Sequence, residues 1–219
     1  MSSILSENQK NLISLIGKES SLCNAFYLGG GTALAEFYLH HRLSEDLDFF
    51  SENEFDPMSI TVFFKKIERE AGILRTEYEQ SFNRNLFFLE LKNDRIKTEF
   101  TYFPFQRVEK DNYFKNIQID SLLDIAINKV FTIYQKPRSR DFIDLYCILQ
   151  KEKDWTLEEL GKKAQIKFDT YLDPIQLGSQ LVKVTELKDY PRMIIELKEK
   201  DWQDFFLHEA SKLEKRILS

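Results

Sequence analysis

The sequence predicts an α/β fold, a mixed sheet with covering helices, that is followed by an all-helical C-terminal part. Two observations carry this prediction: strand-like and helical patterns alternate up to about residue 115, whereas only the helical period is found beyond residue 120. A chain of 219 residues is long enough for one large or two modest domains. We therefore expect an α/β domain over 1–115 and a helical domain over 116–219, with the boundary in the polar stretch 107–120.

The first elements are a helix, a short strand and a turn of three glycines. Apolar residues at spacings of three and four predict an amphipathic helix over 4–18. A short apolar strand, 25–28, stops at Gly29-Gly30-Gly31, and the helix formers in 32–41 predict a helix directly after the turn. A second short strand is expected over 46–50.

A helix and three strands complete the predicted α/β part. Pro57 suits the first turn of a helix and Gly72 suits its end, which predicts a helix over 57–71. Alternating apolar residues then predict three strands, at 73–80, 85–92 and 95–103. Asn93 and Asp94 are expected to form the tight turn between the last two.

The remaining chain is predicted to be helical. Asp120 or Ser121 can cap a helix that runs to about residue 134. Thr156 with Glu159 forms a capping-box pattern at the start of another helix. The other expected helices cover 140–149, a segment that begins at Asp173 and Pro174, and 192–217.

Composition and charge limit the classes of function. Lys and Arg total 31 against 36 Asp and Glu, so the net charge is −5 and any RNA contact must rely on local basic residues. Cys23 and Cys147 lack the paired spacing of a zinc site, and we expect both to be buried, reduced thiols. No run approaches the roughly 20 apolar residues of a membrane span, and the N-terminus has no signal-peptide pattern. We expect a cytoplasmic protein that has no membrane partner.

The glycine turn is the first candidate for a functional element. Glycines between a strand and a helix let backbone N–H groups approach a phosphate closely, and the hydroxyl of Thr32 can add a further contact. An ordinary tight turn explains the same residues equally well. The pattern is neither GxGxxG nor a Walker A loop, which removes support for a Rossmann or P-loop fold.

Three carboxylates are candidates for a metal site. Asp46 and Asp48 are two apart on a predicted strand, so both lie on one face, and oxygen-rich sites of this kind suit Mg²⁺. Two solvated acids at a strand end are the alternative. Glu99 lies in an apolar, aromatic strand, where an unpaired charge is costly to bury. Its partner is either Lys97 on the same face or a metal ion shared with the two aspartates.

The predicted helices carry a second group of candidates. Lys129 lies in an otherwise apolar helical stripe, either as a functional cation or as a side chain that extends to the edge of the stripe. Asp141 and Asp144 are three apart and share a helix face, so they can orient Lys129 or Arg140. Between the helices, basic side chains form a candidate phosphate-binding cluster or an ordinary exposed basic loop; they are Lys136, Arg138 and Arg140.

Four stretches carry a resemblance to a known family. They are Phe26–Ala35, His41–Phe50, Leu122–Lys129 and Arg138–Tyr146. In this order they resemble the nucleotidyltransferases of the AbiEii/AbiGii toxin family, within the DNA polymerase β-like nucleotidyltransferase superfamily. Four motifs in the right order are far more specific than any one of them.

The resemblance implies a nucleotidyltransferase-like fold with a Mg²⁺ site and an NTP as substrate. It makes Asp46 and Asp48 metal ligands, and it places Glu99 on the strand that supplies the third acid, often Asp in relatives, in a one- or two-metal site. It implies that Lys129 and Asp141 are functionally required, with Lys129 neutralising charge on the triphosphate. The nucleotide-binding positions that it implies are Gly30, Gly31, Thr32, Arg42, Ser44 and Lys129.

The function implied by the resemblance is transfer of NMP from an NTP to an acceptor hydroxyl, in a toxin-like role. We expect the acceptor to be RNA, with tRNA as one candidate, bound by Lys136, Arg138 and Arg140. Nucleotidylation of a protein hydroxyl is an alternative, and so is a non-catalytic domain that binds a nucleotide or a partner. A cognate antitoxin is the expected protein partner, and the sequence assigns no role to 150–219.

Overall fold

The computed structural model describes residues 3–110 and 112–217, which form two compact units. We call Met1–Tyr38 with Ser44–Ser121 the sheet unit, and Leu39–Leu43 with Leu122–Ser219 the helical unit. The chain thus leaves the sheet unit after Tyr38, contributes the five residues Leu39–Leu43 to the helical unit, and returns to the sheet unit at Ser44. The boundary expected from the sequence, 1–115 and 116–219, stays a prediction about independently folding domains.

The sheet unit is built on one mixed sheet of seven strands in the order β3-β4-β5-β2-β1-β7-β6. Strands β1 and β7 pair in parallel, as do β2 and β5, and the other neighbours are antiparallel. The strands are β1 Tyr27–Gly29, β2 Leu47–Ser51, β3 Ile73–Ser81, β4 Arg84–Leu91, β5 Asp94–Tyr102, β6 Tyr113–Phe114 and β7 Ile117–Ile119. The predicted mixed sheet is confirmed, whereas β6 and β7 lie in the polar stretch where no strand was expected.

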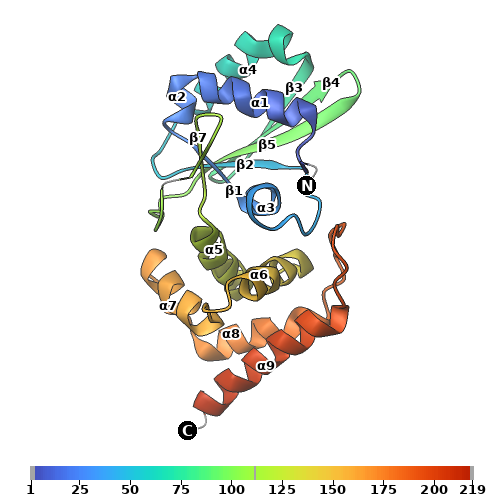
Figure 1. Ribbon diagram of the computed structural model, residues 1–219. Coiled ribbons are helices and arrows are strands. Elements are labelled where there is room, and N and C mark those ends of the chain that lie inside the picture. The colour runs from blue at the N-terminus through green and yellow to red at the C-terminus, as the bar shows by residue number, and fades with distance from the viewer. Residues whose placement is uncertain (1–2, 111, 218–219) are drawn as a thin grey trace. The chain divides into compact units, whose positions relative to one another are not determined.

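Helices α1 (Glu7–Lys18) and α4 (Pro57–Ala71) cover one face of the sheet (Figure 1). The predicted ends of α4 are confirmed, with Pro57 in the first turn and Gly72 in the left-handed conformation after the last. Phe64 of α4 packs on the sheet, its ring centroid 5.1 Å from that of Phe87 and 6.1 Å from that of Phe100. Because side chains alternate along a strand, the residues next to Phe100 lie on the opposite face.

The chain after the glycine turn departs from the predicted regular helix. A single turn, α3 (Gly30–Ala33), leads into a π-helix, Leu34–Leu39, and His40 has a positive φ of 51°. Helix propensity favours helical dihedral angles but does not distinguish α-helical from π-helical hydrogen bonding. The remaining helix of this unit is the short α2, Ser20–Cys23.

The helical unit contains five α-helices and one 3₁₀ turn among the described residues (Figure 1). They are α5 Leu122–Gln135, α6 Ser139–Lys151, α7 Leu157–Lys167, α8 Pro174–Leu181, η2 Val182–Thr185 and α9 Glu199–Ile217. The predicted caps at Thr156 and Asp173 are confirmed by their hydrogen bonds to the next backbone N–H groups. The helix expected over 192–217 begins only at Glu199, because the backbone near Met193 pairs with Arg42 instead.

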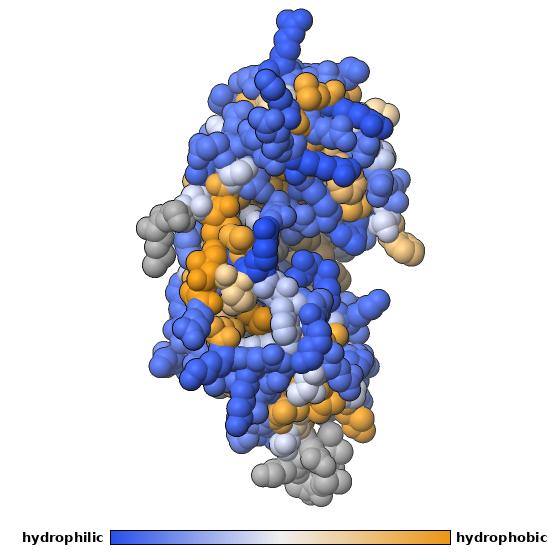
Figure 2. All heavy atoms as spheres, turned by 90° about the vertical axis from the view of Figure 1, so that its right-hand side faces the viewer, coloured by the Kyte–Doolittle hydropathy of each residue, from blue (hydrophilic) through white to orange (hydrophobic). Residues whose placement is uncertain are grey.

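Surface and cysteine environments are ordinary for a globular chain. The face shown in Figure 2 is mostly hydrophilic, with hydrophobic areas broken into separate patches. Cys147 is buried, and burial raises the pKa of its thiol to about 12. Cys23 is only half-buried, so the expectation that both thiols are buried was wrong for it. Within residues 3–110 and 112–217 no helix has the length and apolar character needed to cross a membrane.

Candidate functional site

The glycine turn brings the backbone against one of the predicted metal ligands. Gly29 pairs with Asp48 across β1 and β2, and Gly30 follows with a φ of 68°. A Cβ atom at Gly30 would collide with Oδ2 of Asp48, closer than two non-bonded atoms can approach. Only glycine fits here, because a side chain would suffer both the left-handed backbone conformation and the collision with the carboxylate. The turn therefore seats Asp48.

Thr32 fixes the other predicted ligand through the backbone. Its side chain is fully buried, and its hydroxyl lies 2.5 Å from the carbonyl oxygen of Asp46 and 2.8 Å from Oγ of Ser44. Since the carbonyl can only accept, the hydroxyl donates to Asp46. Thr32 and Ser44 thus hold the segment before β2 in place. Their direct contact with a nucleotide, and that of Gly31, stays a prediction.

The three predicted carboxylates lie on the face of the sheet opposite to α1 and α4. Asp48 and Glu99 occupy paired positions on the parallel strands β2 and β5, and Asp46 lies two residues before Asp48. Phe49 and Phe100, the neighbours of Asp48 and Glu99, stack on each other at 4.9 Å on the opposite, covered face. The sheet therefore places the three acids on one face, and a shared metal site formed by all three stays a prediction.

Two basic side chains pair with these acids. Nζ of Lys97 lies 2.5 Å from Oδ2 of Asp46. Arg84 binds Glu99 with two parallel hydrogen bonds, Nε to Oε1 at 2.7 Å and an Nη2 hydrogen to Oε2 at 2.5 Å. Lys97 is therefore the partner of Asp46 and not of Glu99. Sequence reasoning missed Arg84, although the β4–β5 hairpin register, which pairs Arg84 with Thr101, could have indicated it.

Glu99 is held as a charged carboxylate. Burial alone would raise its pKa, but hydrogen bonds from Arg84 and from the hydroxyl of Thr101, at 2.7 Å, lower the pKa below its usual value. The pKa of Arg84 is raised, first by its hydrogen bond to Glu99 and also by the charges of Asp48 and Asp46. The guanidinium of Arg84 therefore lies within electrostatic range of all three acids.

The chemistry of Asp46 and Asp48 fits a divalent cation. Both offer carboxylate oxygens on one face, the ligands that Mg²⁺ prefers, and Gly30 leaves room for the carboxylate of Asp48. Across residues 3–110 and 112–217, no three His, Cys, Asp or Glu side chains converge in a metal-holding geometry. Glu99 is less suited to bind a metal ion than the two aspartates, because Arg84 donates hydrogen bonds to both of its carboxylate oxygens.

Asp144 is the centre of a second charged cluster, which lies in the helical unit. It is fully buried and accepts hydrogen bonds from Nε and Nη2 of Arg42 at 2.6 and 2.8 Å. Nε2 of His41 lies 2.8 Å from it, and Nζ of Lys129 lies 2.7 Å away. Burial favours the neutral acid, but Lys129, Arg42 and His41 together hold the pKa of Asp144 well below its usual range.

Lys129 bridges two aspartates of α6. Its ammonium lies 2.8 Å from Asp141 and 2.7 Å from Asp144, with only 12% of the side chain exposed. Both aspartates therefore orient Lys129; the sequence had left open whether they orient Lys129 or Arg140. The alternative in which the Lys129 side chain extends to the edge of the apolar stripe was wrong, because the ammonium is held by the two aspartates. Burial alone would lower the pKa of Lys129, but Asp144 and Asp141 raise it overall. A role of Lys129 and Asp141 in nucleotide chemistry stays a prediction.

Arg42 and His41 enter this cluster from the segment Leu39–Leu43. Backbone hydrogen bonds from Leu43 to Arg192 and from Ile194 to His41 anchor the segment within the helical unit. The guanidinium of Arg42 is buried against Asp144, which makes Arg42 a structural anchor in this arrangement. Sequence reasoning gave Arg42 only a nucleotide-binding role and His41 none, because no local pattern connects them to a residue about 100 positions later.

The predicted acceptor-binding residues surround the start of α6. Lys136 is exposed and Arg140 half-buried, and neither forms a side-chain ion pair with the described residues. Arg138 is also exposed, and its Nε lies 3.8 Å from a carboxylate oxygen of Asp141. Arg140 does not pair with Asp144, whose oxygens contact other residues.

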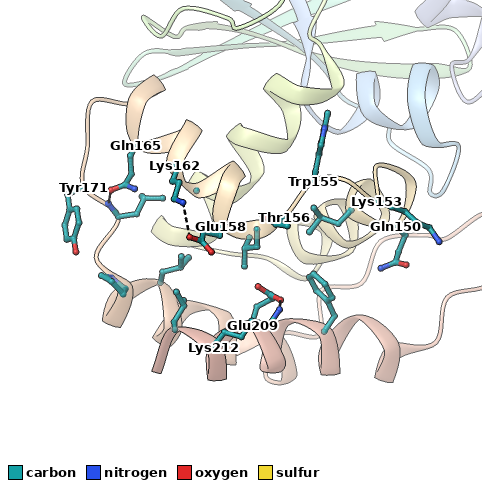
Figure 3. A pocket seen from close by; sticks show the side chains of 18 residues that line it. Gln150, Lys153, Trp155, Thr156, Glu158, Lys162, Gln165, Tyr171, Glu209 and Lys212 are labelled. Atoms are coloured by element: carbon teal, nitrogen blue, oxygen red, sulfur yellow. Dashed lines mark hydrogen bonds and ion pairs between the residues drawn. The ribbon is translucent and has the colours of Figure 1, made fainter. Parts of the chain in front are cut away.

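A cavity of about 790 Å³ lies elsewhere in the helical unit, between α7, α8 and α9 (Figure 3). Its lining includes the apolar residues Leu157, Leu172, Leu177 and Phe205 together with charged residues such as Lys153 and Glu209. Lys162 at its edge forms an ion pair with Glu158 at 3.0 Å. None of the predicted site residues lines it, so the cavity is separate from both charged clusters.

Comparisons with known proteins find a sequence relative and structures of similar fold. An uncharacterised protein of Aquifex aeolicus strain VF5 is 37% identical over 153 residues, which cover 67% of this chain and 68% of that protein. The crystal structure of JHP933 from Helicobacter pylori is similar in fold, with a TM-score of 0.60 and 18% identity over 97% of this chain and 94% of that one. A second crystal structure from H. pylori, provisionally named a nucleotidyltransferase, has a TM-score of 0.61 and 19% sequence identity, and the match covers 97% of each chain.

A family model covers nearly the whole chain. The model of the AbiEii toxin nucleotidyltransferases, from type IV toxin–antitoxin systems, matches residues 15–215. That range contains the glycine turn, the three carboxylates on the sheet and the lysine–aspartate cluster of the helical unit. The chain therefore belongs to the AbiEii family of nucleotidyltransferase toxins.

Proposed function

We propose that this nucleotidyltransferase is metal-dependent and transfers NMP from an NTP to a hydroxyl of RNA. The observation that carries the proposal is the set of carboxylates on the sheet face opposite to α1 and α4, directly beside a turn whose conformation requires glycine at position 30. Asp46 and Asp48 would supply the metal ligands. The binding-only alternative is disfavoured, because a binding scaffold gains nothing from grouping acids whose charges repel one another.

The reaction follows from what the residues can hold in place. An acceptor hydroxyl attacks the α-phosphorus, the bond from that phosphorus to the bridging oxygen breaks, and pyrophosphate leaves. A divalent cation, when bound, neutralises phosphate charge and stabilises the attacking and leaving oxygens. Gly30 seats Asp48, and Thr32 holds the backbone of Asp46, so both carboxylates are positioned before substrate binds.

RNA is favoured over protein as the acceptor by the basic residues at the start of α6. Lys136 and Arg138 are exposed, as phosphate-contacting side chains must be, although the whole chain carries a net charge of −5. A protein hydroxyl would have no need of them. Nucleotidylation of a protein is therefore the second candidate.

The metal assignment is tested by Asp46→Asn and Asp48→Asn. Each change removes a charge at nearly constant volume, so pyrophosphate release should fall on the order of a thousandfold while the circular-dichroism spectrum is unchanged. Glu54→Gln, at an exposed carboxylate of the same unit, is the matched control and should retain full activity. Near wild-type release by either aspartate variant would show that the metal assignment is wrong.

A toxin role and a cognate antitoxin complete the proposal. Family membership supports both, since the matching model describes toxins of type IV toxin–antitoxin systems. Expression of the wild-type chain should slow growth, whereas the Asp46→Asn variant should not. Harmless expression of a protein that is active in vitro would argue against the toxin role.

A further inference from the structure

We propose that Glu99 is a positioning residue for Arg84, and that the guanidinium of Arg84 is the cationic contact for the phosphates of the nucleoside triphosphate. The proposal rests on the proposed function, because it assigns a contact within the same site. It gives Arg84 a role that no sequence motif indicates. It also gives Glu99 a role different from the metal ligation that the family resemblance implies.

The carboxylate of Glu99 is already occupied by hydrogen bonds from its neighbours. Arg84 donates to both oxygens, and Thr101 donates a third hydrogen bond to Oε1 at 2.7 Å. The Glu99 side chain is only 8% exposed, so little of it is left for another ligand. A metal ion could bind this carboxylate only after the two-bond contact with Arg84 had been broken, which costs more than breaking a single hydrogen bond.

The guanidinium of Arg84 keeps N–H groups that Glu99 does not use. Arg84 uses Nε and one Nη2 hydrogen on Glu99, and its Nη1 group has no hydrogen-bond partner among the described residues. Half of the Arg84 side chain is exposed. The remaining N–H groups are thus open to a ligand, while the carboxylate fixes the plane of the guanidinium. Such a fixed, planar donor suits a phosphate better than a mobile lysine does.

Arg84 also lies on the same sheet face as the proposed metal ligands. Arg84 pairs with Thr101 across β4 and β5, and Thr101 is two residues from Glu99, so all three lie on the same face of the sheet. Asp48 pairs with Glu99 on the next strand and lies on that face as well. A triphosphate held by a cation at Asp46 and Asp48 would therefore lie beside Arg84, whose pKa already responds to both aspartates.

Two binding measurements separate this role from metal ligation without any turnover. The probes are Mn²⁺ alone, followed by the electron paramagnetic resonance of the free ion, and the unreactive α,β-methylene analogues of the four ribonucleoside triphosphates. The variants are Glu99→Gln, Arg84→Met and the double change. Arg75→Met removes a comparable exposed arginine that pairs with Glu77 at 3.1 Å on β3, and it serves as the control.

The proposal predicts that Glu99→Gln binds Mn²⁺ within about twofold of wild type. Arg84→Met should raise the Kd of the analogue by about tenfold or more, the value of one charge-assisted hydrogen-bonded contact. Glu99→Gln should raise that Kd by less, and it should add nothing in the Arg84→Met background. Arg84→Lys, which keeps the charge without the planar fork, should fall between wild type and Arg84→Met. Arg75→Met should bind as wild type does.

Three results would overturn the proposal. A tenfold loss of Mn²⁺ affinity in Glu99→Gln would make Glu99 a metal ligand. Unchanged analogue affinity in Arg84→Met, with only a lowered melting temperature, would make the Arg84–Glu99 pair purely structural. Absence of both Mn²⁺ and analogue binding in the wild-type protein would instead refute the proposed function, and this proposal with it.

Discussion

Gly30 affects both the backbone conformation of the turn and the position of the Asp48 carboxylate. Gly30 has a positive φ, and the carboxylate of Asp48 lies where a Cβ atom of this residue would be. The turn can therefore form beside Asp48 only without a side chain at position 30. Gly72, at the end of α4, has nearly the same φ of 69° but no atom within 4 Å of its would-be Cβ. Substitutions at these two glycines therefore distinguish the effect of backbone strain, which both share, from the effect of the contact with Asp48, which only Gly30 has.

Gly30→Ala should abolish metal binding and transfer, whereas Gly72→Ala should not. Both changes place a side chain in the left-handed region, at a cost of about 1–2 kcal/mol in the free energy of unfolding. Only Gly30→Ala also displaces the carboxylate of Asp48. Urea unfolding and Mn²⁺ titration of the two variants measure the two effects. Equal activity of both variants would contradict the seating of Asp48 by the turn.

Lys97 is the internal cation at Asp46. Its ammonium lies 2.5 Å from the carboxylate, so a metal ion must compete with it. Lys97→Met should therefore strengthen Mn²⁺ binding by roughly threefold to tenfold, the value of an exposed to half-buried ion pair. The effect should vanish in the Asp46→Asn background. Weaker Mn²⁺ binding by Lys97→Met would show that Lys97 supports the metal ligands and does not compete with the metal.

The pairings of these residues could not be predicted from local sequence. The shared face of Asp46 and Asp48 follows from the strand period, because alternate residues point the same way, but the position of Glu99 on that face depends on the pairing of β2 with β5. Their partners depend on which strands are neighbours and in which register. Lys97 was one of the two partners considered for Glu99 because the two share a strand face, yet it pairs with Asp46, directly before the adjacent strand β2.

At the scale of elements, α5 and α6 are joined by the charges around Asp144. Lys129 comes from α5, Asp141 and Asp144 from α6, and Arg42 with His41 from the segment Leu39–Leu43. A buried carboxylate with three basic neighbours is satisfied only while all the elements stay in place. Removal of one partner from such a pair costs about 3–5 kcal/mol.

The depressed pKa of Asp144 predicts a pH dependence of stability. Its folded pKa lies well below the unfolded value of about 4, so its contribution is complete above pH 4 and is lost as the pH falls toward the folded pKa. The free energy of unfolding of wild type should therefore drop more between about pH 5 and pH 2 than that of Asp144→Asn. Urea unfolding across this range measures the difference.

An exposed aspartate provides the control for this titration. Asp154→Asn, in the same unit, should follow the wild-type pH dependence throughout. If the free energy of unfolding of wild type and of Asp144→Asn changed in parallel with pH, the account would be contradicted. Protonation of Asp144 would then remove no stabilising contact.

Elements with local end signals were predicted well, and those fixed by distant contacts were not. Helix α4 was expected at 57–71, as observed, because Pro57 and Gly72 are local signals for its start and its end. Strand β7 has three residues, too few for a period, and exists because β1 pairs with it. The segment Leu39–Leu43 likewise takes its conformation from residues about 150 positions later.

At the scale of the whole molecule, the distribution of charge bears on the acceptor. The net charge of −5 provides no general attraction for RNA, so binding must depend on a few basic side chains. The exposed pair Lys136 and Arg138 meets this requirement in the helical unit.

Changing Lys136 and Arg138 to Ala together should raise the apparent KM for RNA and flatten its salt dependence. Each lost phosphate contact lowers the slope of log affinity against log salt by roughly one. Lys163 and Lys200, two exposed lysines elsewhere in the same unit, form the control pair and should leave the slope unchanged. An unaltered slope in the first variant, or an equal loss of activity toward a protein acceptor, would favour protein nucleotidylation instead.

The central claim is that this chain moves an NMP group with a metal held by Asp46 and Asp48. The most direct measurement incubates the protein with Mg²⁺, RNA and each of the four NTPs, labelled either at the α- or at the γ-phosphate. The account predicts that RNA gains the α label from at least one NTP, that the γ label appears as pyrophosphate, and that Asp46→Asn and Asp48→Asn transfer neither. Transfer of the γ label to RNA, or α-label transfer that persists in both variants, would contradict it.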